Sequence, residues 1–191
     1  FDLDLNINLN NYRISQLFNF NSILIEFLKS ELLFNENISL NTSIVVNTNK
    51  KDEIFHNAEI YFSILNGKIN LNDSRFINDN IGQLELNNSN LFLKNNKLIL
   101  NTDLLFDIKN VDDLFSFLNT NKKSRKEIKN ILVNLDYNFS DNEFRFIKIK
   151  VNNNKVSDQF LNIIEEFNDN NSNNLIKSRR LLNKLLDIYE G

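Results

Sequence analysis

The sequence of 191 residues contains no cysteine, methionine, tryptophan or proline, and it has only three glycines. Without cysteine the chain can form no disulfide, no thiol nucleophile and no cysteine-ligated zinc or iron–sulfur centre. A single histidine, His56, excludes histidine clusters and most imidazole proton relays. Three scattered glycines cannot build a phosphate-binding loop. Much of enzyme chemistry is therefore excluded, and we expect no enzyme activity and no cofactor.

Two further features are missing from the sequence. No run of about 18 apolar residues occurs, so we expect no membrane-spanning helix in this segment. The 22 lysines and arginines are balanced by 25 aspartates and glutamates, a net charge of −3 that argues against a nucleic-acid binder. Because the sequence begins at Phe1 without an initiator methionine, we interpret it as a segment of a longer chain, with any N-terminal anchor lying outside it.

The residues that are present describe a folded domain. Hydrophobic residues make up 41% of the sequence and charged residues 25%, which rules out intrinsic disorder and favours a single domain. Asparagine is the most conspicuous residue, with 40 copies against one alanine. This bias is typical of an AT-rich genome, so we attribute much of the composition to codon usage.

Alternation of apolar and polar residues with a period of two is the dominant pattern, and it predicts about nine strands. Asn66-Gly67 is a preferred pair for a tight hairpin turn. The apolar parity switches between Phe146 and Ile147, which indicates either a β-bulge or a strand buried on both faces. The predicted strands cover residues 1–9, 38–46, 58–64, 68–72, 84–87, 91–94, 98–108, 131–139 and 144–151.

Apolar residues at helical spacing predict four helices, over residues 21–33, 113–118, 158–167 and 175–189. Asp112 is the expected N-cap of the second helix and Ser157 that of the third. The sequence thus predicts a mainly β fold with a few helices (α+β). We expect an antiparallel β meander over residues 1–152, followed by a linker at 168–174 within an amphipathic helical tail over 153–191.

The acidic pairs and the histidine carry little chemistry. His56 could act as a general base, but we interpret it as a surface residue at a strand edge. Adjacent acids such as Asp112-Asp113 and Glu165-Glu166 point in different directions, and no third ligand stands at helical spacing. No metal site is predicted.

Two basic clusters allow two interpretations. They could attract anionic lipid headgroups or a protein partner, or they could be solvated surface that balances local acids. The first cluster is formed by Lys122, Lys123, Arg125, Lys126 and Lys129, and the second by Lys177, Arg179, Arg180 and Lys184.

The apolar face of the predicted sheet also allows two interpretations. Nine strands about 4.8 Å apart, each about 20 Å long, would present roughly 900 Å² of apolar face, which exceeds a tolerated exposed patch. The sheet could fold over and use the helices to close an ordinary core. Alternatively, the face could line a groove for lipid chains.

Several stretches of local sequence resemble a known family. They are Ile81-Gly82-Gln83-Leu84-Glu85-Leu86, the run Leu91 to Leu98 across Asn95-Asn96, Leu114 to Leu118, Lys122 to Lys126, and Ser178 to Leu186. With the order of the predicted elements, they resemble the C-terminal region of AsmA-like proteins from AT-rich Gram-negative bacteria. The resemblance covers most of the chain and is strongest over residues 81–191.

The resemblance implies a curved, groove-like sheet in a periplasmic protein held at the inner membrane by an N-terminal anchor. Such proteins shelter the acyl chains of phospholipids on an apolar groove between the two membranes, without catalysis, and contribute to outer-membrane biogenesis. The resemblance implies phospholipids as partners, with the membrane surface or outer-membrane proteins as further candidates. The competing hypothesis is a closed structural or adhesive β-domain that binds a protein. The candidate groove residues are Leu98, Leu100, Leu104, Phe106, Ile131, Val133, Leu135 and Tyr137, and the candidate headgroup or partner contacts are Lys122, Lys123, Arg125, Lys126, Arg179 and Arg180.

Overall fold

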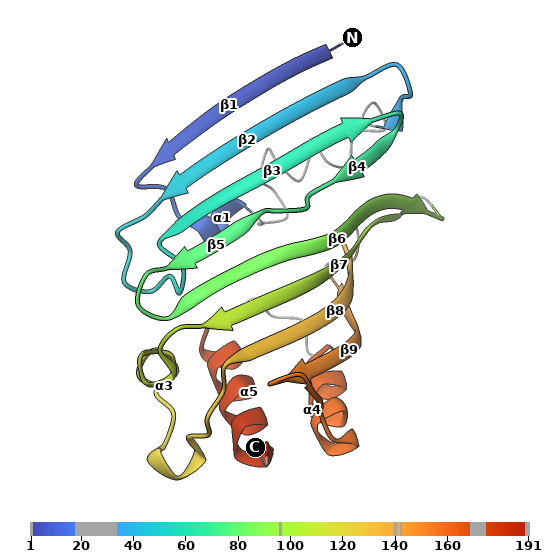
Figure 1. The fold of residues 1–191 in the computed structure, drawn as a ribbon. Coiled ribbons are helices and arrows are strands. Elements are labelled where there is room, and N and C mark those ends of the chain that lie inside the picture. The colour runs from blue at the N-terminus through green and yellow to red at the C-terminus, as the bar shows by residue number, and fades with distance from the viewer. Residues whose placement is uncertain are drawn as a thin grey trace.

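The computed structural model describes residues 2–17, 34–95, 97–139, 141, 143–168 and 175–189 (Figure 1). The helix predicted over 21–33 lies outside the described residues, as does nearly all of the predicted linker at 168–174. The side chains of 166–168 and 175–178 are also outside the description.

The described chain is mainly β with a few helices, as predicted. A ten-stranded sheet runs in the order β1-β2-β3-β4-β6-β7-β8-β9-β10, with β5 paired to both β3 and β6. The strands are β1 (Asp2–Asn10), β2 (Ser39–Asn47), β3 (Asn57–Leu65), β4 (Lys68–Asn70), β5 (Arg75–Asn78), β6 (Gly82–Lys94), β7 (Lys97–Ile108), β8 (Asn130–Asn138), β9 (Glu143–Val151) and β10 (Asn154–Lys155). The helices are α1 (Ile14–Leu17), α3 (Val111–Leu118), α4 (Asp158–Asn168) and α5 (Leu175–Ile188), with a 3-10 turn η2 (Lys122–Ser124).

The strand pairing corrects the prediction of a purely antiparallel meander. β1 is parallel to β2, with Leu3 opposite Leu40 and Ile7 opposite Ile44, so the sheet is mixed. A hairpin cannot connect two parallel strands, and the chain between them runs through α1 and residues 18–38. The strands β5 and β10 were not predicted. Conversely, the two strands predicted within 84–94 form the single strand β6, with a register shift between Asn87 and Asn90.

The period-two pattern places most of the large apolar side chains of the strands on one face of the sheet, which we call the apolar face. Neighbouring strands align on it: Ile44 of β2 lies opposite Ile60 of β3, and Leu100 of β7 lies opposite Tyr137 of β8. The other face, the polar face, carries most of the asparagines and aspartates together with some apolar side chains, such as Phe92, Ile99 and Leu132. Because the strands pair in register, these polar residues also meet across the sheet.

A register shift at β9 explains the change of apolar parity in this strand. Asn134 of β8 pairs with Lys148, but the next residue, Leu135, pairs with Phe146, so Ile147 is the extra residue. Its side chain is 54% exposed. The parity switch therefore reflects a β-bulge rather than burial on both faces.

The helix caps are partly as predicted. Ser157 accepts a hydrogen bond at its Oγ from the backbone N–H of Phe160 (3.3 Å), which confirms it at the start of α4. The prediction of Asp112 as a cap is wrong, because Asn110 holds that position. The Asn110 Oδ1 accepts from the backbone N–H groups of Asp112 (3.0 Å) and Asp113 (3.3 Å). Both aspartates lie instead in the first turn of α3, where the helix dipole favours negative charge.

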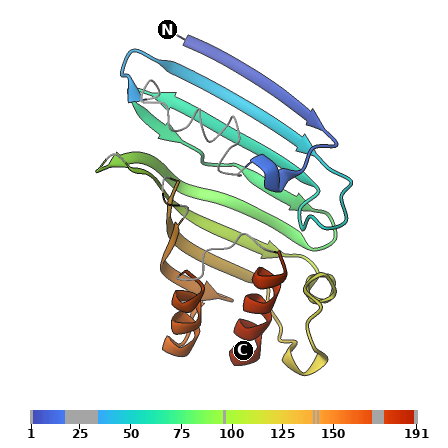
Figure 2. The ribbon, with the colours of Figure 1, turned by 180° about the vertical axis from the view of Figure 1, so that it is seen from behind.

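The helices pack against the apolar face, the side toward the viewer in Figure 2. Ile14 and Leu17 of α1 are buried in a cluster that also contains buried residues of strands β2 to β7. Phe160, Ile163 and Ile164 of α4 join Ile149 of β9 in a second cluster, to which α5 contributes Leu185. A third cluster joins α3 and α5 beneath one end of β7 and β8 and includes Ile81, Leu114, Phe115, Ile128 and Leu186. The apolar face is thus covered in separate pieces.

Asparagine performs turn functions that glycine usually performs. Among the residues that the structure describes, eight non-glycine residues have a positive φ, and seven of them are asparagines, including Asn66, Asn95 and Asn119. Asparagine tolerates the left-handed region better than other residues with a Cβ. Gly82 is different, because its φ of +144° is combined with close backbone packing: a Cβ there would lie 2.0 Å from the carbonyl oxygen of Asp107. Only glycine fits this start of β6.

We predict that Gly82→Ala destabilises the protein by about 2 kcal/mol or more, because alanine would be strained at this φ and would collide with the β7 backbone. Urea denaturation followed by circular dichroism measures the effect. The neighbouring Gln83→Ala serves as a control and should stay within about 1 kcal/mol of the parent protein. Equal stability of the parent protein and Gly82→Ala would contradict the close approach of β6 and β7.

Candidate functional site

The eight groove candidates lie together on the apolar face, on the adjacent strands β7 and β8. Three cross-strand pairs are directly opposite each other: Leu100 with Tyr137, Leu104 with Val133, and Phe106 with Ile131. Leu135 lies opposite Thr102. The sequence pattern predicted which residues share a face of each strand, and the pairing of β7 with β8 brings the two sets together.

Burial divides these eight residues into two groups. Leu98, Leu100 and Leu135 are buried, with exposed fractions of 1%, 9% and 4%. The other five are only half-buried. They are joined by Leu84 of β6, which lies opposite Phe106. We call this half-buried set the central strip; it consists of Leu84, Leu104, Phe106, Ile131, Val133 and Tyr137.

The central strip is apolar along its whole length. On the apolar face of β7 and β8 the only polar side chain besides the Tyr137 phenol is that of Thr102, which is buried and donates to the carbonyl of Asn87 (3.2 Å). Burial raises the pKa of the Tyr137 phenol above its ordinary value, so its hydroxyl stays neutral. From Ile131 to Tyr137 the strip spans about 20 Å along β8, with the buried Leu135 between Val133 and Tyr137; this span exceeds the roughly 15 Å of one leaflet's hydrocarbon.

Aromatic rings stand at both ends of the central strip. At one end the ring of Phe55 makes an edge-on contact with Phe106, with centroids 5.9 Å apart. At the other end Tyr137 stacks on Phe144 of β9 at 4.4 Å, and Phe144 is 38% exposed. Sequence reasoning missed Phe55, Leu84 and Phe144 as neighbours of the strip, because they come from other elements and only the strand pairing and loop path reveal their position.

The two basic clusters meet at one corner of the molecule, although 55 residues separate Ser124 from Arg179. Thr120 donates to the Asn183 Oδ1 (2.6 Å), and Asn183 donates to the carbonyl of Leu118 (3.0 Å). The hydroxyl of Ser124 donates to the carboxylate of Asp187. These bonds fix η2 against α5.

We call the meeting point of the two clusters the basic corner; its residues are Lys122, Lys123, Arg125, Lys126, Arg179 and Arg180. Two of its arginines lie over aromatic rings. Arg179 is 4.6 Å from the ring centroid of Phe117, and Arg125 is 5.8 Å from that of Phe115. These cation–π contacts hold the guanidinium groups in place. Lys122, Lys123 and Arg180 are exposed, so positive charge faces solvent at this corner.

In the part of the chain that the structure describes, no group of catalytic side chains surrounds His56 or the acidic pairs considered from the sequence. His56 is half-buried in the loop before β3, where its backbone bonds to Ile77 and Thr48. Among the described residues no three histidine, aspartate or glutamate side chains gather as metal ligands. Within the same residues no helix is long and apolar enough to cross a bilayer.

Comparison with known protein families, with curated proteins and with solved structures finds no match to this chain. Inference about its function therefore depends on the site geometry.

The exposed fraction of each apolar side chain predicts how much its truncation to alanine lowers the free energy of unfolding. Leu98→Ala should lower the free energy of unfolding by about 2–5 kcal/mol, because it leaves a cavity in the core. Leu104→Ala, on the same strand and the same face, should cost about 1 kcal/mol because its side chain is already partly in water. Chemical denaturation of both variants measures the difference. Equal, large losses would indicate that the strip is an ordinary closed core.

Proposed function

We propose that the central strip shelters phospholipid acyl chains, and that the protein takes part in AsmA-type, non-enzymatic lipid transfer between the inner and outer membranes. In this proposal the sheet acts as one wall of a groove, and an anchor outside this sequence attaches the protein to the inner membrane in the periplasm. The observation that supports it is the half-burial of six apolar side chains in the middle of a large sheet. Side chains in a closed core would be fully buried.

The chemistry of the central strip fits acyl chains. A lipid tail offers only apolar surface, so its binding requires a dry apolar wall without charges or unpaired polar groups. The β7 and β8 residues of this face include two polar groups: the Thr102 hydroxyl, which is bonded to a carbonyl, and the Tyr137 phenol, which stays neutral. The polar headgroup would remain in water at the border of the strip.

A closed structural or adhesive domain that binds a protein partner is the alternative function. It requires the apolar face to be covered by the chain itself, with no lipid retained in the purified protein. The half-buried central strip favours lipid binding over this alternative.

Lipid carried through purification tests the proposal directly. Native mass spectrometry of the gently purified protein should show bound phospholipid, and Leu104→Asp with Val133→Asp should lose it, because two charges would stand opposite each other on the strip. Leu105→Asp is the matched control: it lies on the same strand and is half-buried on the polar face. Changes at Leu100 are avoided because that side chain is buried and its loss would unfold the core.

The outcomes separate the two functions. Lipid lost in the double variant and kept in Leu105→Asp, with unchanged circular dichroism, supports the proposed groove. A lipid-free, monodisperse parent protein overturns it and favours the closed domain. If the double variant unfolds, the milder pair Leu104→Asn and Val133→Thr gives the same comparison with smaller charge effects.

The basic corner supports a second element of the proposal, which is contact with anionic headgroups. Each basic residue near an anionic bilayer contributes about 1 kcal/mol of attraction. Asp112 lies 3.8 Å from Arg125, but Lys122, Lys123 and Arg180 form no salt bridge with an acid among the described residues. Their charges are available to a membrane surface.

We predict that reversing the charge of Lys122, Lys123 and Arg180 to glutamate weakens binding to phosphatidylglycerol vesicles at least about tenfold at low salt. Vesicle co-sedimentation measures the change, with phosphatidylcholine vesicles as the neutral reference. The control reverses the exposed Lys50, Lys51 and Lys68, an identical change of net charge at another part of the sheet. The same loss in both triple variants would show that net charge, rather than the basic corner, governs binding.

A further inference from the structure

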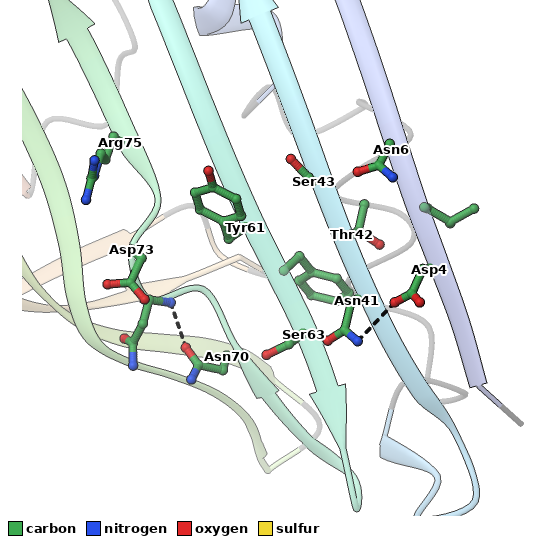
Figure 3. A pocket seen from close by; sticks show the side chains of 13 residues that line it. Asp4, Asn6, Asn41, Thr42, Ser43, Tyr61, Ser63, Asn70, Asp73 and Arg75 are labelled. Atoms are coloured by element: carbon green, nitrogen blue, oxygen red, sulfur yellow. Dashed lines mark hydrogen bonds between the residues drawn. The ribbon is translucent and has the colours of Figure 1, made fainter.

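The polar face of the sheet contains a hollow of about 730 Å³, on the side away from the central strip (Figure 3). It extends from β1 across β2 and β3 to the segment that joins β4 and β5. Its volume is within the range of ligand pockets in proteins, roughly 300–1,000 Å³. The proposed lipid function does not use this hollow.

The floor of the hollow is made by small side chains in register. Asn6 of β1 lies opposite Ser43 of β2, and Ser43 lies opposite Tyr61 of β3. Ser63, two residues beyond Tyr61, lies opposite Asn41. Because serine is short, the two serines leave a depression between the larger side chains of β1 and Tyr61.

One wall of the hollow is the segment between β4 and β5, where Asp73 has a φ of +65°. The backbone of Asp73 and Ser74 remains bonded to Leu86 of β6 (3.0 and 2.9 Å). Ser74 fills the place of a paired strand: its Oγ accepts from the N–H of Tyr61 (3.0 Å) and donates to the carbonyl of Tyr61 (3.1 Å). The buried Ser89 holds the other side of this segment through the Asn72 Oδ1 (2.9 Å). The wall is thus fixed by specific bonds.

Several polar groups of the hollow are free to bind a ligand. Within the described part of the chain, the side chains of Asn6, Ser43 and Ser63 and the carboxylate of Asp73 have no hydrogen-bond partner. They supply both donors and acceptors. Tyr61 is 41% exposed and adds a ring face and a phenolic hydroxyl.

The charges and the geometry of the hollow argue against two classes of ligand, anions and extended peptides. Asp4 and Asp73 disfavour an anion, and the one cationic side chain that lines the hollow, Arg75, lies 3.4 Å from Glu85. An extended peptide would pair with a strand edge, whereas the hollow is on the face of the sheet. A neutral ligand rich in hydroxyl groups, with C–H faces that can stack on Tyr61, matches the donors, acceptors and ring. We propose that this hollow binds a short neutral oligosaccharide.

Binding of defined sugars tests the proposal. The probes are maltotetraose, cellotetraose and chitotetraose, with tetragalacturonate as an anionic tetrasaccharide, measured by saturation-transfer NMR and titration calorimetry. At least one neutral probe should bind, and tetragalacturonate should bind more weakly because of Asp4 and Asp73. Ser43→Phe, which fills the floor, and Tyr61→Ala, which removes the ring, should each weaken binding about tenfold or more.

Two controls keep the result interpretable. Val45→Phe introduces the same side chain on the same face of β2, two residues beyond the hollow, and Leu65→Ala truncates an exposed residue on the same face of β3 as Tyr61. Both should bind sugar like the parent protein. The proposal is overturned if no neutral probe binds, if Ser43→Phe and Tyr61→Ala bind as well as the controls, or if tetragalacturonate binds best. If Ser43→Phe fails to fold, Ser43→Leu and Tyr61→Ala provide the test.

Discussion

The alternating pleat of one sheet is the constraint on which the rest of the structure depends. Period-two alternation places most apolar residues of the strands on one face, and that face then needs cover. Among the described residues the cover comes from short helices: α1 has four residues, α3 eight, α4 eleven and α5 fourteen. The side chains of the central strip pack at the margins of the three clusters around these helices and stay half-buried. The candidate site lies at these margins.

Asparagine abundance has structural consequences beyond codon usage. Seven asparagines occupy the left-handed region at turns and caps, in a chain with only three glycines. Asparagines also tie neighbouring strands on the polar face: Asn88, one of these seven, and Asn134 both donate to the carboxylate of Asp103 (2.7 and 2.8 Å), and Asn101 donates to Asp136 (2.7 Å). An amide that donates to an ionised carboxylate forms a stronger bond than one between two neutral groups. The fold thus accommodates the excess of asparagine. It places asparagines at turns with a left-handed backbone and on the polar face, where their amides bond to neighbouring strands.

Local pattern predicted the β class, most strand positions, the Ser157 cap and the shared face of the groove candidates, because each depends on residues close in sequence. The parallel pairing of β1 with β2 was not predictable in this way, since alternation in Asp2–Asn10 is the same for either direction. β5 has four residues, too few for a periodic signal.

The cap at Asn110 was missed because three candidate residues, Asn110, Asp112 and Asp113, precede the same apolar run and only the backbone path distinguishes them. The half-burial of Leu104 beside the buried Leu100 depends on the tertiary packing around each residue, and residue pattern contains no such information.

The two faces of the sheet share strands but not chemistry, and this follows from the pleat. On β2, Ser43 faces the polar hollow while its neighbour Ile44 is 6% exposed in the core. On β7, Leu104 belongs to the central strip while Leu105 faces the other way. Ligands on opposite faces would therefore touch different side chains, and any coupling between them would pass through the strand backbones rather than through a shared contact. A one-residue slip of register would exchange the two sets, so the burial of Ile44, Ile60 and Leu100 that fixes the register also keeps both candidate surfaces in place.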